Sequence, residues 1–346
     1  MAPHARDKYE MLHKVGQGAY GEVWKAVIKE TGQEVAIKDI KLQKRTDGVE
    51  RSAIDEIRLM QELAHPNILT LFEVFAAREG TLSLVTDFMQ TDLEIVIKAK
   101  KDPFIQMLPS EVKAYMKMFL SGVAFCHDNF VLHRDLKPAN LLLGADGVLK
   151  LCDFGLARTF GSPHAKYSHE AITLWYRPME MLLGAQQYGS ACDMWGVGAI
   201  FGEFLLRSPL FATAEGASDL NQIQRIVEFM GAPSEKSWPG MSHLPISVTF
   251  KDTPAAPYRQ IFATAGKDAL DLLFKLLRYD PSTRCSAAEA LEHGYLTSGD
   301  PPAPCATIAL RVQELNVAKV KEREAVASFA AQVAAAKVGH KRKADA

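Results

Sequence analysis

The fold is decided by residues 133–155, which read HRDLKPANLLLGADGVLKLCDFG. The first part places Asp135, Lys137 and Asn140 on one tight loop, and a short apolar strand with an Asp-Gly turn then leads to Asp153. Amide and carboxylate oxygens, as in Asn140 and Asp153, are hard ligands that Mg²⁺ takes together with phosphate oxygens and water. Asp135 is suited to orient a hydroxyl and accept its proton, and Lys137 to neutralise charge on a migrating phosphoryl group. The set predicts transfer of a γ-phosphate to an alcohol, because that reaction depends on positioning and charge stabilisation.

The composition is that of a soluble, globular chain with room for two lobes: 346 residues, 48% hydrophobic and 23% charged. The formal net charge is −1, so no global field attracts nucleic acid or a membrane surface, and neither is an expected direct partner. No stretch is long and apolar enough to span a bilayer, and the N-terminus lacks the apolar core of a secretory signal. The five cysteines are scattered without a CxxC pair, which indicates reduced thiols.

A glycine-rich segment, Gly16-Gln17-Gly18-Ala19-Tyr20-Gly21, lies between two predicted strands at 9–16 and 22–28. A dinucleotide-binding GxGxxG would lead into a helix. Here the apolar and β-branched residues of GEVWKAVI favour a strand instead. We therefore predict a hairpin that covers the phosphates of a nucleotide; the alternative is an ordinary hairpin loop.

The next predicted strand contains Val35-Ala36-Ile37-Lys38. Alternation places Ala36 and Lys38 on one face, where Ala36 is small enough to cover an adenine and Lys38 can reach the α- and β-phosphates. A helix is predicted over 50–63, with Glu56 inside its apolar stripe, so this carboxylate should face the interior and need a cation. The stripe is formed by Ala53, Ile57, Met60 and Ala64.

This ordered series of motifs resembles that of eukaryotic protein kinases over residues 9–296. The resemblance implies an α+β, bilobal fold. The N-lobe, 9–88, would be small and mainly β with one helix, and the C-lobe, 89–296, larger and mainly helical. Residues 297–346 would form a linker and a C-terminal tail, partly helical or disordered.

The resemblance also implies the site residues. Two helical segments and the hinge are expected to position them: the helix from about Ser110 to Asp128, the buried helix 190–207, and Val85 to Met89. For catalysis the implied residues are Asp135, Lys137, Lys38, Glu56 and Thr173, with Lys38 paired to Glu56. ATP would be bound with Mg²⁺ held by Asn140 and Asp153. The implied ATP-binding residues are Val15, Gly16, Gly18, Gly21, Val23, Ala36, Lys38, Thr86, Asp87, Met89, Asp92 and Leu142.

At the hinge, backbone groups of Asp87 and Met89 would hydrogen-bond adenine. Thr86 would be the gatekeeper, and it departs from relatives that carry a bulky aromatic there, which predicts a deeper pocket. Thr91-Asp92 is a cap-like pair that should begin the next helix. Cys152 is expected to be buried and inert; the alternative is a thiol that borders the pocket and reacts with a ligand.

The activation segment, 153–180, contains the predicted phosphorylation sites. Ser168 aligns with the phosphorylated T-loop position of cyclin-dependent kinases, and Ser162, followed by proline, is a second candidate. Arg134 and Arg158 would form the phosphate pocket.

The third arginine of that phosphate pocket in relatives is replaced by Asp55. We hypothesise that Asp55 pairs with Arg134 or Arg158 and makes activity less dependent on phosphorylated Ser168. Alternatively, Arg51, one turn earlier on the helix, neutralises Asp55.

The end of the segment carries further implied roles. Thr173 should bond near Asp135, and Arg177 should hold the preceding backbone so that the site after the target residue favours proline. The usual Ala-Pro-Glu is Pro178-Met179-Glu180 here, and Arg284 should pair with Glu180. Asp193 should hold the backbone of the catalytic loop, cap its helix, or both.

Within the cyclin-dependent family, the phrases SLVTDFMQTDLEIVIK, GVLKLCDFGLARTFGSP and TFKDTP resemble the activating kinase, the kinase subunit of TFIIH. The resemblance implies a proline-directed serine/threonine kinase with a cyclin H-like partner, the assembly factor MAT-one and TFIIH. Implied substrates are T-loops of other cyclin-dependent kinases and the heptad repeats of RNA polymerase II. The implied location is the nucleus, with the cytoplasm as a second site; His340-Lys341-Arg342-Lys343 resembles an import signal or is a solubilising tail. The alternatives are a cell-division type of cyclin-dependent kinase and a pseudokinase scaffold.

Overall fold

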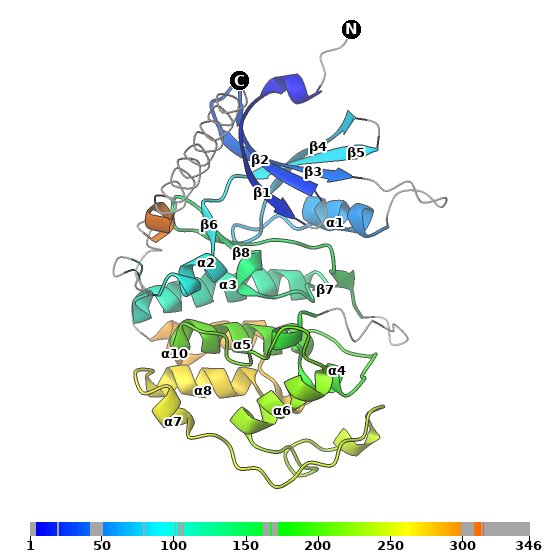
Figure 1. Ribbon diagram of the computed structural model, residues 1–346, viewed down its shortest axis with the longest axis vertical. Helices are drawn as coiled ribbons and strands as arrows, with labels where there is room; N and C mark the ends of the chain where they lie inside the picture. Colours follow the sequence, from blue (N-terminus) through cyan, green and yellow to red (C-terminus); the bar gives the residue numbers. More distant parts are fainter. Residues whose placement is uncertain are drawn as a thin grey trace, which may run out of the picture.

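The chain forms two lobes stacked along its long axis, a small sheet-rich lobe above a larger helical one (Figure 1). The computed structural model describes residues 5–18, 21–41, 51–78, 80–100, 102, 105, 107–161, 167, 172–298, 308–312 and 314. Within these residues the predicted bilobal α+β fold is confirmed. None of the described helices has the length and apolarity that crossing a membrane would require.

The N-lobe is built on an antiparallel sheet of five strands in the order β1-β2-β3-β5-β4. A short 3₁₀ helix, η1 (Ala5–Lys8), precedes it, and the helix α1 (Arg51–Glu62) follows the third strand. The strands are β1 (Tyr9–Gly18), β2 (Gly21–Ile28), β3 (Glu34–Lys41), β4 (Leu71–Arg78) and β5 (Thr81–Asp87).

The two faces of β3 divide as the alternation predicts. Val35 and Ile37 are fully buried in a cluster on one face of the sheet. Ala36 and Lys38 point to the other face and are only half-buried. The rest of that cluster is Tyr9, Ala26, Phe75, Ala77 and Val85.

The apolar stripe of α1 differs from the prediction. Glu56, Leu59 and Met60 are buried, but Ala64 is exposed and Leu63 is buried in its place. The reason is that α1 ends at Glu62, so helical spacing does not extend to residue 64. The predicted orientation of Glu56 toward the interior is confirmed.

The segment before β4 joins the two lobes. The strand β4 begins only at Leu71. Before it, Asn67 and Leu69 exchange backbone hydrogen bonds of 2.9 Å with Leu151 of the other lobe, and Ile68 forms a bridge with the same residue.

The C-lobe consists of helices around two small sheets. The helices are α2 (Leu93–Lys98), α3 (Pro109–Asp128), α4 (Met179–Leu182), α5 (Ala191–Leu206), α6 (Asp219–Met230), α7 (Tyr258–Ile261), α8 (Lys267–Leu276), α9 (Ala287–Leu291) and α10 (Gly294–Thr297). The strands β6 (Thr91–Asp92), β8 (Leu141–Leu143) and β9 (Leu149–Leu151) form one sheet, and β7 (Val131–Leu132) pairs with β10 (Arg158–Thr159). Four 3₁₀ turns complete the lobe: η2 (Pro138–Asn140), η3 (Leu174–Tyr176), η4 (Met241–His243) and η5 (Pro281–Thr283).

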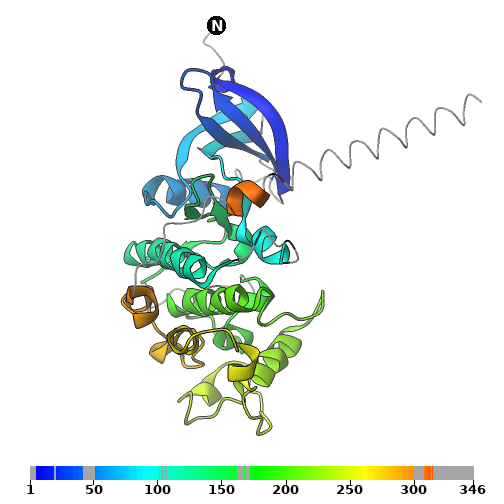
Figure 2. The same cartoon turned by 90° about the vertical axis from the view of Figure 1, so that its left-hand side faces the viewer.

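Helix α5 is the centre of this lobe, between α3 and α8 (Figure 2). Its side chains are buried on every side, including Trp195, Phe201 and Phe204, as an all-round apolar helix requires. The predicted helix from about Ser110 to Asp128 is confirmed as α3, and its apolar stripe is buried: Val112, Met116, Phe119, Val123 and Cys126.

A piece of the tail returns to this core. Residues 308–312 are helical, and Ile308, Ala309 and Val312 are buried in the same apolar cluster as the C-lobe helices. Both views show this segment beside α2, at the level where the two lobes meet.

Candidate active site

Asp135 is the hub of a hydrogen-bond network in the catalytic loop. Its carboxylate accepts from Lys137 Nζ at 2.5 Å and from Thr173 Oγ1 at 2.7 Å. The amide Nδ2 of Asn140 donates to the Asp135 carbonyl at 2.7 Å and to its carboxylate at 3.1 Å. Only 4% of Asp135 is exposed, so the network fixes a buried carboxylate in one orientation.

Asp193 holds the backbone of this loop from helix α5. The amides of His133 and Arg134 each donate to its carboxylate at 2.9 Å, and His127 Nε2 lies 3.0 Å from it. Burial alone would raise the pKa of Asp193, but the bonds from His127 and the backbone hold that pKa below its ordinary value. The predicted anchoring contact is therefore present. The capping alternative is wrong, because α5 begins at Ala191 with Ser190 at the cap position.

The loop also carries backbone strain. Arg134 and Asp153 adopt left-handed φ values of 63° and 67°, which side chains of this kind rarely take. Such conformations persist only where the surroundings determine them, and they gather at functional sites. Asp193 supplies that support for Arg134.

The two predicted metal ligands are brought together. The amide of Cys152 donates to the carbonyl of Asn140 at 3.0 Å, so the residue before Asp153 is bonded to Asn140 itself. Because Nδ2 of Asn140 is used by Asp135, the side-chain amide is oriented and its Oδ1 is left as the ligand atom. One amide oxygen and one carboxylate, beside phosphate oxygens and water, fit Mg²⁺.

Lys38 and Glu56 form the predicted ion pair, with 2.9 Å between Nζ and Oε1. Burial lowers the pKa of Lys38, but the neighbouring charges of Glu56 and Asp153 outweigh this and raise the pKa above its ordinary value. Asp153 is thus close enough to act electrostatically on Lys38. The catalytic lysine, its partner and the metal aspartate belong to one region of the molecule.

The glycine-rich segment is the tip of the β1–β2 hairpin, where Gly18 pairs with Gly21, and no helix follows it. Glycine is required at position 21, because a Cβ there would lie 1.6 Å from the carbonyl oxygen of Asp39. Val15 is exposed and Val23 half-buried on the two strands of this hairpin. Gly16 has open space where a side chain would stand.

The predicted adenine-binding residues lie on adjoining strands. Ala36 of β3 pairs with Thr86 of β5, and Leu142 of β8 pairs with Asp92 of β6. Thr86 is buried, Met89 and Leu142 are half-buried, and Asp92 caps α2 by accepting from the Ile95 amide at 2.9 Å. The amide of Asp87 donates to the Thr70 carbonyl at 3.3 Å. The Asp87 carbonyl accepts from the Thr86 hydroxyl at 3.3 Å, and its second lone pair can accept from a base.

The hinge has a support that the sequence analysis missed. The side chain of Asp87 binds Lys150 Nζ at 2.6 Å and the Thr70 amide at 2.9 Å. Lys150 lies between two buried leucines on the short strand β9. A charged residue in such a strand was the available signal that it has a partner.

Cys152, beside Asp153, is only half-buried, so the full burial predicted for it is wrong. Burial, followed by the charge of Asp153, raises the pKa of its thiol well above the ordinary value. Since the thiolate is the reactive form, this supports the prediction of an inert thiol.

Two arginines, Arg177 and Arg284, hold the end of the activation segment by hydrogen bonds and ion pairs. Arg177 donates from Nε and Nη2 to the Ile172 carbonyl at 3.0 and 2.9 Å, and its Nη1 lies 2.8 Å from Asp219, a partner that was not predicted. The buried Arg284–Glu180 pair is bidentate, at 2.8 and 3.1 Å. The departure to Pro178-Met179 therefore leaves this pair intact. Ser162 and Ser168 lie outside the described residues.

The predicted pairing of Asp55 with Arg134 or Arg158 is wrong, while the lower dependence on phosphorylated Ser168 stays a prediction. Arg134 donates from Nε to the Leu156 carbonyl at 2.7 Å and from Nη1 to the Tyr188 hydroxyl at 3.2 Å, and Arg158 donates to the Ala157 carbonyl at 2.7 Å. Neither guanidinium pairs with Asp55 among the described contacts, and that of Arg134 is oriented by these other oxygens. The side chain of Arg51, the alternative partner, is outside the described residues.

Comparison with known proteins agrees with this geometry. Residues 9–296 match the protein kinase domain. The chain is 46% identical to "Cyclin-dependent kinase 7" of Xenopus laevis, over 91% of each chain. It is 45% identical to the protein of that name from Dictyostelium discoideum, over 90% of this chain and 88% of that one. It is 48% identical to "Cyclin-dependent kinase D-1" of Oryza sativa subsp. japonica, over 86% and 68%.

Among solved structures, the CAK complex of Chaetomium thermophilum, bound to ATP-gamma-S, has a chain that superimposes with a TM-score of 0.80 at 38% identity. The match covers 88% of this chain and 94% of the other. With the catalytic network and the Lys38–Glu56 pair in place, the chain belongs to the protein kinase family and, within it, to the cyclin-dependent serine/threonine kinases.

Proposed function

We propose that this chain transfers the γ-phosphate of ATP to serine or threonine residues followed by proline, in complex with a cyclin. The observation that carries the proposal is the network around Asp135, which joins Lys137, Thr173 and Asn140 in one arrangement beside Asp153. ATP binding is supported by the kinase fold and by the ATP analogue in the related complex.

In the proposed mechanism, Asp135 orients the substrate hydroxyl and accepts its proton as the oxygen bonds to the γ-phosphorus and the bond to the departing ADP oxygen breaks. Lys137, 2.5 Å from Asp135, neutralises charge on the transferred group. Lys38, fixed by Glu56, binds the α- and β-phosphates. Mg²⁺, held by Asn140 and Asp153, would supply charge neutralisation for the phosphates.

Preference for proline is proposed from the position of Arg177. Its guanidinium donates two hydrogen bonds to the Ile172 carbonyl, so this carbonyl is not available to accept one from the amide of a substrate. Proline has no amide hydrogen and loses nothing at such a position, whereas other residues would leave a donor unpaired.

The substrates and partners are proposed from the named relatives. The relatives are named as cyclin-dependent kinase 7 and as part of a CAK complex. From the resemblance in sequence we propose the T-loops of other cyclin-dependent kinases and the heptad repeats of RNA polymerase II as substrates. The same resemblance is the basis on which we propose a cyclin H-like partner, an assembly factor, a TFIIH-like assembly and nuclear location. Phosphorylation of Ser168, with Ser162 second, remains part of this proposal, as do Arg134 and Arg158 as phosphate ligands.

The test is peptide phosphorylation by the full chain purified with its cyclin. We expect a heptad-repeat peptide to be phosphorylated at its Ser-Pro sites, and Asp135→Asn to abolish this. Preference for a histone peptide would instead favour a cell-division type. Activity of Asp135→Asn equal to the unchanged chain, or no activity in either, would contradict the proposal and favour a scaffold.

A further inference from the structure

Arg134, the residue before the catalytic aspartate, is held by two tyrosines. Its Nη1 donates to the Tyr188 hydroxyl at 3.2 Å, and its guanidinium carbon lies 5.6 Å from the centre of the Tyr167 ring. The two rings contact each other, with centroids 5.2 Å apart. The guanidinium thus has a hydroxyl oxygen on one edge and an aromatic face beside it, an arrangement that attracts a cation.

The tyrosines are themselves fixed by the backbone. Tyr167 donates its amide to the Gln186 carbonyl at 2.9 Å and its hydroxyl to the Thr159 carbonyl at 3.0 Å. Tyr188 leads into helix α5, whose Asp193 accepts from the Arg134 amide at 2.9 Å. One connection, 188–193, therefore holds Arg134 twice, by its side chain and by its backbone.

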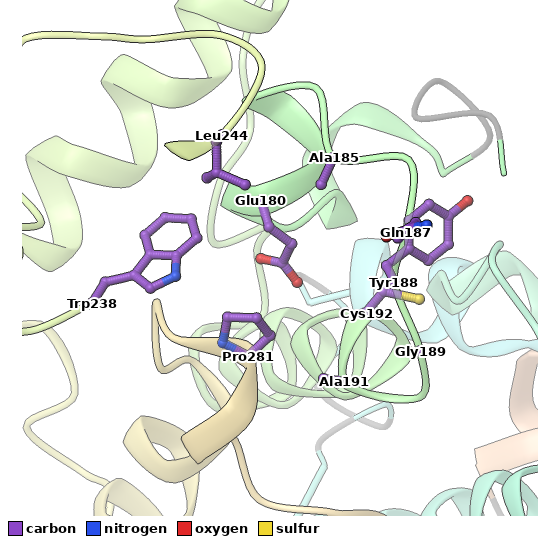
Figure 3. A pocket seen from close by; sticks show the side chains of 10 residues that line it. All are labelled: Glu180, Ala185, Gln187, Tyr188, Gly189, Ala191, Cys192, Trp238, Leu244 and Pro281. Carbon is purple, nitrogen blue, oxygen red and sulfur yellow. The ribbon is translucent and has the colours of Figure 1, made fainter. Parts of the chain in front are cut away.

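Tyr188 also borders a pocket of about 190 Å³ in the C-lobe, on the opposite side from Trp238 (Figure 3). The other walls include Leu244, Pro281 and Cys192. The ring of Tyr188 thus has space beside it on the side of the pocket.

Asp55 weakens the phosphate pocket to which Arg134 is expected to contribute. This position would carry a third phosphate-binding arginine if the helix followed the pattern of its relatives, and it carries a carboxylate instead. A carboxylate repels a phosphate and removes one charge-assisted hydrogen bond, so phosphorylation alone is a weaker means of ordering Arg134 here.

We propose that Tyr188, assisted by Tyr167, is a positioning residue that holds Arg134, and through it Asp135, in the catalytic orientation while Ser168 is unphosphorylated. The inference rests on the proposed function. A phosphate on Ser168 would offer Arg134 stronger, charged acceptors and take over the role of the tyrosine hydroxyl.

The test uses the cyclin-bound full chain in two states, Ser168→Ala and genetically encoded phosphoserine at position 168. In the Ser168→Ala background, Tyr188→Phe should lower kcat for a Ser-Pro peptide about five- to thirty-fold, the effect of one charge-assisted hydrogen bond, and leave KM for ATP unchanged. With phosphoserine the loss should shrink to less than about twofold. Tyr167→Ala should behave like Tyr188→Phe, and Tyr167→Phe, which keeps the ring, should have a smaller effect.

The matched control is Tyr258→Phe on α7, whose ring packs edge-to-face against Phe274, far from Arg134 in the sequence. An equal loss in both phosphorylation states, or no loss in either, overturns the inference. A readout without catalysis separates it from the proposed function: hydrogen exchange of the amides of 133–136 should become faster in Tyr188→Phe only without phosphoserine. If that difference is present in a chain that phosphorylates no peptide, the proposed function fails and the positioning role stands.

Discussion

Lys150 and Asp87 join the two lobes at the hinge, with 2.6 Å between Nζ and Oδ2. Lys150 belongs to β9, the strand that leads to Asp153, and Asp87 ends β5, the strand that leads into the hinge. The contact links the predicted adenine-binding backbone to the predicted metal ligand. It is half-buried on both sides, so water screens it only in part.

We predict that Lys150→Met raises KM for ATP about fivefold, with little change in kcat. This corresponds to about 1 kcal/mol, the upper value for an ion pair that water still reaches. Steady-state kinetics with varied ATP measures this. Lys150→Arg keeps the charge and is the control. An unchanged KM in Lys150→Met would show that the pair does not position the hinge.

The contribution of Thr173 to catalysis should come from its hydroxyl group alone. Its Oγ1 donates to the Asp135 carboxylate at 2.7 Å, so Thr173→Val removes the bond at nearly constant volume. We expect kcat to fall by about 10²-fold, the lower range for a misplaced general base. Thr173→Ser should retain most activity; equal losses in both variants would point to packing instead.

The Arg284–Glu180 pair should be a large contributor to stability. Both side chains are almost fully buried, and removing one partner leaves an unpaired buried charge. Arg284→Ala should therefore lower the free energy of unfolding by about 3–5 kcal/mol. Denaturant unfolding measures this, with Arg58→Ala as the control because its pair with Glu62 is exposed. A loss no larger than that of the control would contradict the prediction.

Glu203 should make stability depend on pH. Burial is the main cause that raises its pKa to about 7, and the hydroxyl of Tyr176 donates to it at 2.9 Å. The folded chain then keeps this proton at pH values where the unfolded chain, with a pKa near 4.5, has lost it. The stabilisation is complete below about pH 4.5 and is lost as the pH rises through about 7.

Glu203→Gln removes this titration while keeping a polar side chain of similar shape. The difference in free energy of unfolding between the unchanged chain and Glu203→Gln should shift by on the order of 3 kcal/mol between pH 4.5 and 7.5. Equilibrium unfolding of both proteins across this range tests it. A constant difference would mean that Glu203 titrates alike in the folded and unfolded states.

The residues of the catalytic network were predictable because each lies in a short, ordered motif. Lys38 and Glu56 could also be placed by periodicity, since strand alternation and helical spacing orient single side chains. Local spacing cannot supply contacts between distant positions, such as Arg134 with Tyr188 or Asp87 with Lys150. The predicted pairing of Asp55 with Arg134 was wrong for this reason: charge alone suggested it, and the competing oxygens of Leu156 and Tyr188 could not be seen in the sequence.

The end of α1 shows a second limit of prediction from sequence, which is the position of helix ends. A stripe extended to Ala64 assumes that the helix continues, whereas the chain leaves it at Glu62 and buries Leu63 instead. Helix ends are set by tertiary contacts as much as by local sequence, and extending the stripe two residues past the end of α1 was enough to misplace one member.

The return of residues 308–312 to the core has a practical side for protein engineering. A recombinant chain stopped at Leu296, where the catalytic motifs end, would lack Ile308, Ala309 and Val312. The apolar side chains that these residues cover would then be exposed to water. Such a truncated enzyme should aggregate during purification. Affinity tags and fusion partners therefore belong beyond residue 314.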